Sequence, residues 1–188
     1  MTLFEYLAIA YSLVISFAVL RALSGLPHAF GTQRRYWIHL AWVCWNLQAS
    51  IMEFWIFWGF RDIEWSYGLF LLVLANPAVL YVMACILTPE EPSHVASWRE
   101  HFYAIRLKLF VTAICWRFVL LAITIVVLEL PLDHPIFLIH LVSFVIWVAG
   151  AFSKRPTVHA TIACIMLAAA VSSAVPFLSR PGGIVAVP

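Results

Sequence analysis

The stretch WIHLAWVCWNLQASIMEFWIFWGF, residues 37–60, decides how the rest of the chain is interpreted. It is long and apolar, with five tryptophans, yet it also holds His39, Asn46 and Glu53 at intervals of seven residues. Seven residues make two helical turns, so these polar side chains fall on nearly one face of a helix. Ionisable groups inside a bilayer are costly and usually face a protein interior or a hydrated cavity. The stretch therefore predicts a membrane helix whose polar stripe faces other helices.

The composition points the same way. Of the 188 residues, 64% are hydrophobic and only 11% are charged, which excludes an ordinary soluble globule. The 11 basic and 9 acidic residues nearly balance, so a nucleic-acid partner is not expected. Glu5 stands where a signal peptide would carry basic residues, so the first apolar run is interpreted as a membrane helix. The lipid bilayer is the expected environment of the whole chain.

Six apolar runs are long enough to cross a bilayer, which takes about 20 residues. They cover about 3–24, 36–60, 66–88, 105–129, 135–152 and 157–178. Gly25-Leu26-Pro27 is predicted to end the first run, and Pro156 to open the last. A helical bundle satisfies the backbone hydrogen bonds of such runs, which are too long and too evenly apolar for barrel strands. The prediction is an all-α fold: residues 1–188 form one transmembrane domain of six helices.

The basic residues predict the orientation of this bundle. Eight of them fall in or beside the loops on one side and two on the other, with Arg117 inside a span. The larger group comprises Arg21, Arg34, Arg35, Arg99, Arg106, Lys108, Lys154 and Arg155, and the smaller group comprises Arg61 and Arg180. Cytoplasmic loops carry the excess of lysine and arginine, so both termini are predicted to lie outside. We expect a multi-pass protein of the bacterial inner membrane.

A short helix is predicted just before the fourth span. Ser97 and Glu100 have the spacing of a capping box, and Trp98 and Phe102 fall on one helical face. The pattern is typical of an interfacial helix that lies among lipid headgroups and runs into the fourth span, or that docks a cytoplasmic partner.

Small residues and cysteines complete the packing pattern. Two stripes of small residues at four-residue intervals predict close helix contacts, within the bundle or between copies. They are Ala8, Ser12 and Ser16 in the first run, and Ala160, Cys164, Ala168 and Ser172 in the last. The four cysteines lie in the middle of different runs, form no CxxC pair and are interpreted as small apolar residues.

Three ionisable residues form the favoured polar cluster. Arg117 lies near the middle of the fourth span, from where its side chain reaches an interface with difficulty. Helical rise places Glu53 roughly 7–10 Å further toward the outside, and His140 at about the depth of Glu53. We expect Glu53, Arg117 and His140 to lie together. The alternative is a buried ion pair that only fixes helix register.

Asn76-Pro77 in the third span adds a second polar feature near the mid-plane. Proline cannot donate to the helical ladder, so a carbonyl one turn earlier, near Val73, is left free. Together with Asn46, this predicts polar groups on two helices that line a cavity, or else a simple kink.

Cofactor and enzyme signals are weak. His39 and His159 lie at similar depth near the cytoplasmic ends of their helices, as two axial haem ligands would. No HExxH, GxSxG or phosphate-binding loop is present, so catalysis and a dedicated metal site are not expected.

Three functions remain open from the sequence. The first is a transporter or channel for protons or small cations that uses Glu53, Arg117, His140, Asn46, His39 and Asn76. The second is a non-catalytic accessory or binding subunit of a larger membrane complex, or a homo-oligomer, in which the polar residues fix register and interfaces. The third is a haem redox protein built on His39 and His159.

Overall fold

The computed structural model describes residues 2–30 and 36–177, and over those residues the chain contains helices and no strand. The α-helices are α1 (Leu3–Ala29), α2 (Trp37–Phe57), α3 (Tyr67–Leu87), α4 (Trp98–Val126), α5 (Ile136–Phe152) and α6 (Pro156–Phe177). Two 3₁₀ turns, η1 (Trp58–Phe60) and η2 (Pro92–His94), extend α2 and precede α4. The prediction of an all-helical fold with six helices is confirmed, since each helix lies on one of the six apolar runs.

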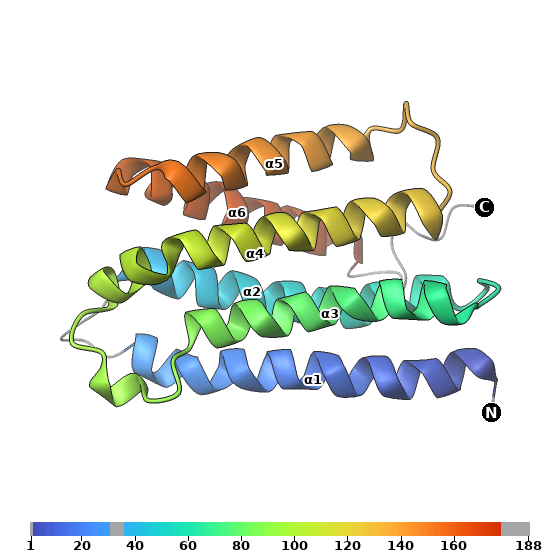
Figure 1. Cartoon of the computed structure of the whole chain (residues 1–188), viewed down its shortest axis with the longest axis horizontal. Helices are drawn as coiled ribbons and strands as arrows, with labels where there is room; N and C mark the ends of the chain where they lie inside the picture. The colour runs from blue at the N-terminus through green and yellow to red at the C-terminus, as the bar shows by residue number, and fades with distance from the viewer. Residues whose placement is uncertain (1, 31–35, 178–188) are drawn as a thin grey trace.

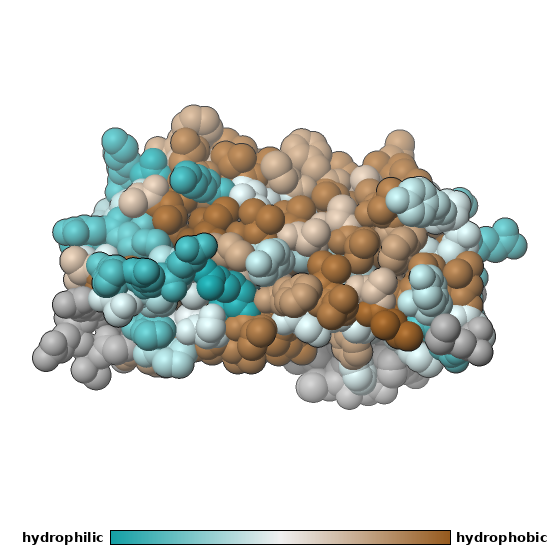
Figure 2. Space-filling model, turned by 60° about the horizontal axis from the view of Figure 1, so that its bottom comes forward, coloured by the Kyte–Doolittle hydropathy of each residue, from teal (hydrophilic) through white to brown (hydrophobic). Residues whose placement is uncertain are grey.

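The helices form an up-and-down bundle in which successive helices run in opposite directions (Figure 1). α1 packs on α2 and α3, α3 on α4, and α4 on α5, while α6 lies against α2. Three helices, α1, α3 and α4, are long and apolar enough to cross a membrane. Hydrophobic residues cover the middle of the face in Figure 2, and hydrophilic residues gather toward its ends, most densely at the left.

The first helix is longer than predicted. Gly25-Leu26-Pro27 does not end it, and the helix continues to Ala29 with Pro27 in its last turn. A Cβ on Gly25 would overlap the side chain of Thr88, so this glycine permits the close approach of the end of α3. The guanidinium of Arg21 donates a hydrogen bond to the Thr88 carbonyl at 2.8 Å. These contacts stabilise the last turn, where proline removes only one helical hydrogen bond.

The short helix predicted before the fourth span forms the first turns of α4 and runs into that span without a break. Ser97 caps the helix by accepting a hydrogen bond from the backbone N–H of Glu100 at 3.4 Å. Trp98 and Phe102, expected to face headgroups, are buried. The Trp98 indole donates to the carbonyl of His28 at 3.1 Å, so the start of α4 stabilises the end of α1.

The two stripes of small residues are not the main contact faces within the bundle. On α6, Cys164, Ala168 and Ser172 are exposed. On α1 the hydroxyls of Ser12 and Ser16 donate to carbonyls of their own helix at 2.6 Å. The face of α1 that is buried instead carries Leu7, Tyr11, Ile15, Ala18, Ala22, Gly25 and Ala29.

Two apolar clusters make up the core, one toward each end of the bundle. The larger contains Trp42, Trp45, Phe110, Trp116 and Trp147, whose rings contact one another with centroids 5.4–6.1 Å apart. The smaller contains Tyr11, Phe57, Phe60, Val73 and Ile123. Along each of the helices α2, α3 and α4, the buried polar residues of the site lie at or beside the junction between these two clusters.

Candidate functional site

The site centres on the carboxyl group of Glu53, on the buried face of α2. Glu53 is 7% exposed, and its Oε2 accepts a hydrogen bond from the amide Nδ2 of Asn76 on α3 at 2.5 Å. Its other oxygen, Oε1, has no hydrogen-bond partner among the described residues. One oxygen of the buried carboxyl group is therefore held by Asn76, and the other makes no hydrogen bond to a described residue.

Trp116 on α4 fixes the orientation of Asn76. Its indole Nε1 donates to Oδ1 of Asn76 at 2.6 Å. The indole nitrogen is a donor only, so the amide atom that faces Trp116 must be the oxygen. The NH₂ group of Asn76 is consequently turned toward Glu53. This chain of two hydrogen bonds joins α2, α3 and α4.

Further polar groups of α2 lie one and two turns from Glu53. Asn46 is fully buried, and its Nδ2 donates to the Leu80 carbonyl of α3 at 3.2 Å, while its Oδ1 has no partner. The buried hydroxyl of Ser50 donates to the Asn46 carbonyl at 2.9 Å. On the other side, the hydroxyl of Tyr11 lies 3.5 Å from the backbone carbonyl of Glu53. The predicted stripe on α2 thus faces the interior, as expected.

Arg117 and His140 lie nearby but are not the direct partners of Glu53. The guanidinium of Arg117 interacts electrostatically with both Glu53 and His140, and it lies 5.0 Å from the centroid of the Trp116 ring. Within the described residues, ion pairs join Arg61 to Asp62 and His94 to Glu91, and none involves Arg117. The alternative of a buried Glu53–Arg117 ion pair is therefore not realised in this structure.

His140 makes its contact with a residue that the sequence did not single out. Its Nε2 lies 3.1 Å from the hydroxyl of Thr124 on α4, which also donates to the Leu120 carbonyl at 2.9 Å. The Thr124 hydroxyl thus lies within hydrogen-bond distance of both the Leu120 carbonyl and the His140 ring, and its single proton can be donated to one of them. Nδ1 of His140 has no partner.

Proline at position 77 does not break α3. The helix runs without interruption from Tyr67 to Leu87, and Asn76 and Pro77 are both buried. The polar group that this dipeptide supplies to the site is the Asn76 side chain rather than a carbonyl exposed by a break.

His39 and His159 lie in an aromatic region at the opposite end of α2 from Glu53. His39 stacks on Trp98 with ring centroids 4.7 Å apart, and neither of its ring nitrogens has a partner. His159 contacts Phe102 and Phe110, and its Nε2 lies 3.0 Å from the Ser153 carbonyl. Aromatic side chains therefore pack against both imidazole rings, in place of an open slot for a haem. Across the described ranges, no three or more His, Cys, Asp or Glu residues are grouped to hold a metal ion.

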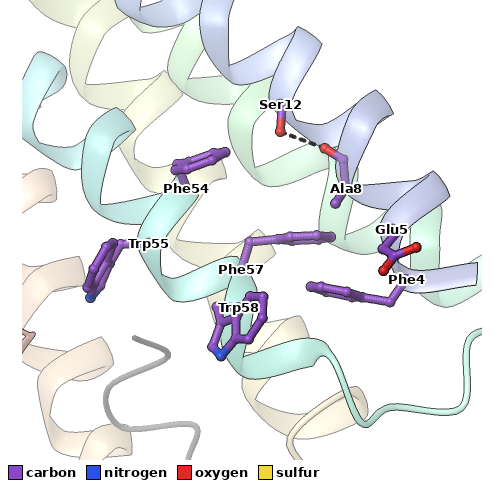
Figure 3. A pocket seen from close by; sticks show the side chains of 8 residues that line it. All are labelled: Phe4, Glu5, Ala8, Ser12, Phe54, Trp55, Phe57 and Trp58. Carbon is purple, nitrogen blue, oxygen red and sulfur yellow. Dashed lines mark hydrogen bonds between the residues drawn. The ribbon is translucent and has the colours of Figure 1, made fainter. Parts of the chain in front are cut away.

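A surface groove runs along the seam between α1 and α2 (Figure 3). It has a volume of about 470 Å³ and is lined by Phe4, Glu5, Ala8, Ser12, Phe54, Trp55, Phe57 and Trp58. A second groove of about 300 Å³ further along the same seam shares Phe54. Glu53 and Asn76 line neither groove, but Ser50, one turn from Glu53 on α2, lines the second.

Comparisons of the chain with protein-family models, with curated proteins and with solved structures find no match. The functional argument therefore depends on the geometry of the site.

Tyr11, Ser50, Trp116 and Thr124 belong to the site but were not candidates from the sequence. In the sequence, Trp116 is not distinguishable from the other tryptophans of the apolar runs, because the large apolar ring suits a core position. The one signal that could have identified it is its depth, since a buried indole N–H usually requires an acceptor.

Proposed function

We propose that this is a six-span inner-membrane protein, with both termini outside, that moves protons or small cations across the bilayer through Glu53. Three helices long and apolar enough to cross a membrane support insertion. The basic residues Arg21, Arg99, Lys154 and Arg155 lie at the ends of helices that meet at one end of the up-and-down bundle, which supports the orientation. Arg34, Arg35 and Arg180, which entered the same argument, lie outside the described residues.

One observation carries the transport proposal: a buried carboxyl group in the outer half of the bundle has an amide partner and no basic partner. A buried carboxylate with only a structural role would need a close counter-ion to offset the free-energy cost of its desolvation. Glu53 has Asn76 instead, and Arg117 remains at longer range. Such a group can change its protonation or bound cation without breaking an ion pair. Ionisable residues placed this way in membrane proteins mark ion pathways.

The test is flux into liposomes that contain the purified protein. A pH gradient or a gradient of a small cation is imposed, and internal pH or ion content is followed. Glu53→Gln should reduce the flux to that of protein-free liposomes, and Glu53→Asp should retain part of it. Glu64→Gln, which changes an exposed acid, is the matched control and should leave the flux unchanged. Equal flux through Glu53→Gln and the unsubstituted protein would refute the proposal.

A second candidate function is an accessory subunit or homo-oligomer, which the exposed small residues of α6 favour. Cys164, Ala168 and Ser172 share one side of that helix and are exposed in the part of the chain that the structure describes. Small residues of this kind allow two membrane helices to approach closely. Oxidative cross-linking through Cys164 in membranes would support a symmetric contact. A monomer in membranes with intact Glu53-dependent flux would exclude this role.

The haem hypothesis receives no comparable support. Bis-histidine ligation requires two imidazole nitrogens directed at one iron. Nε2 of His159 already contacts a backbone carbonyl, and His39 stacks on a tryptophan. An absorption spectrum of the purified protein tests it, because a Soret band would reinstate haem binding.

A further inference from the structure

The proposed function leaves open whether Glu53 takes up a proton or a metal cation. The direction of the hydrogen bonds around its carboxyl group distinguishes between the two. Every described side chain that directly contacts its carboxylate or its backbone carbonyl acts as a donor there. Asn76 donates to Oε2, and the Tyr11 hydroxyl points at the backbone oxygen. The Asn76 oxygen, which would be the natural second ligand for a cation, already accepts from Trp116. Because an indole nitrogen can only donate, Asn76 cannot turn around without leaving that N–H unpaired.

A metal cation has the opposite requirement. Hard cations such as Ca²⁺ and Mg²⁺ are surrounded by six or more oxygen atoms, and cation filters are built from carbonyl or carboxylate oxygens. At Glu53 the carboxylate oxygen without a partner is Oε1, the Asn76 oxygen already accepts from Trp116, and the Ser50 hydroxyl, whose proton is donated to the Asn46 carbonyl, leaves one further oxygen, far fewer than a coordination shell needs. To coordinate a cation, the Asn76 oxygen would have to turn away from Trp116. The hydrogen bonds that join Trp116, Asn76 and Glu53 would then break, and buried donors would be left without acceptors. That cost opposes binding of a dehydrated sodium or potassium ion.

A proton needs none of this rearrangement. It adds to the free Oε1 atom, converting the carboxylate to a carboxylic acid, while Oε2 continues to accept from Asn76. Release reverses the step, so only one O–H bond forms or breaks. The loaded form is neutral, which suits a position inside a membrane bundle.

We infer that the Glu53 site is selective for protons over metal cations and that Trp116 sets this selectivity by fixing the Asn76 amide. The inference rests on the proposed function and names its ion. Trp116 acts as a positioning residue, since it touches Asn76 and not the ion.

The first measurement is binding, by labelling Glu53 in detergent micelles with a hydrophobic carbodiimide, which reacts with the protonated carboxyl group. The labelling rate should fall as pH rises and should not change when sodium or potassium chloride replaces choline chloride. Slower labelling in sodium or potassium than in choline would overturn the inference, because it would mean that the cation occupies the carboxylate.

The second measurement separates this inference from the proposed function. Liposomes containing the protein are given either a pH gradient or a sodium gradient. Glu53-dependent proton flux without sodium flux supports both. Glu53-dependent sodium flux overturns the selectivity while the transport proposal stands. Absence of any Glu53-dependent flux refutes transport, and the labelling result alone then decides whether the site selects protons.

Trp116→Phe tests the positioning role. It removes the N–H that holds Asn76, so the amide oxygen can turn toward Glu53, and protection of Glu53 by sodium should appear. Trp147→Phe is the matched control, because this buried tryptophan has an indole N–H without a partner and should leave labelling unchanged. If the Trp116→Phe variant is folded and its rate of Glu53 labelling does not change with sodium, then Trp116 does not set the selectivity.

Discussion

Replacing Asn76 with leucine should destabilise the protein more than neutralising Glu53 does. Asn76→Leu removes both hydrogen bonds of the chain, at 2.5 Å to Glu53 and 2.6 Å from Trp116, and leaves a buried carboxyl and a buried indole N–H unpaired. Polar contacts between membrane helices contribute about 0.6 kcal/mol on average and up to about 2 kcal/mol. Two lost contacts therefore predict a loss of about 1–4 kcal/mol in the free energy of unfolding.

Glu53→Gln is the matched comparison for that loss. The glutamine oxygen still accepts from the Asn76 amide, so the loss of stability should be smaller than for Asn76→Leu, which removes both hydrogen bonds. Trp116→Phe removes one of the two contacts and should fall between these variants. The proton flux should behave differently, because Glu53→Gln is the variant that abolishes it.

The assay is reversible unfolding of the purified protein by sodium dodecyl sulfate in mixed micelles, followed by helicity or tryptophan fluorescence. The expected order of stability is Glu53→Gln above Trp116→Phe above Asn76→Leu. If Asn76→Leu were as stable as Glu53→Gln, the hydrogen-bonded chain would contribute nothing. The assignment of Asn76 as the partner of Glu53 would then be wrong.

Two further predictions concern packing and topology. Gly150→Ala should cost about 1–3 kcal/mol through overpacking, because a Cβ there would overlap the ring of Phe110. Gly68→Ala is its control, since a Cβ there meets only Ser66 Oγ at 4.0 Å, and it should not destabilise; equal losses in the two unfolding assays would contradict this packing argument. For topology, a membrane-impermeant thiol reagent applied to intact cells should label Leu132→Cys and not Ser93→Cys, and the reverse result would invert the proposed orientation.

The helices were predictable because their signal is local. Each helix follows from an apolar run whose length, and whose flanking proline, glycine and charged residues, are visible in the sequence. The errors arose where a neighbouring helix decides the outcome. Pro27 stays within α1 because Gly25 and Arg21 contact Thr88, and Trp98 is buried because α1 and α2 cover it. Neither neighbour can be identified from the local pattern.

The position of the site residues along the helix axes could be predicted, but the direction in which each side chain points could not. Depth along each helix placed His140 level with Glu53, and Arg117 roughly 7–10 Å further inward, toward the mid-plane where Asn76 was expected. Successive residues on a helix are rotated by about 100°, so Trp116 and Arg117 share a depth and face different ways. It is Trp116 that faces Asn76, while Arg117 remains half-buried. The rotation of α4 about its axis depends on packing against α3 and α5, which the sequence alone does not determine.

The position of the site between the two apolar clusters restricts how an ion could cross. Toward the basic end of the bundle, the rings of Trp42, Trp45, Trp116 and Trp147 pack against one another, and Ser50 and Asn46 lie on α2 one and two turns from Glu53. A route between these rings would require the contact between Trp45 and Trp116 to open. That opening would also strain the hydrogen bond from Trp116 to Asn76, which holds the amide against Glu53. Under the proposed function, access to Glu53 along this route and the hydrogen bond that positions Asn76 against the carboxyl group would therefore be coupled through the side chain of Trp116.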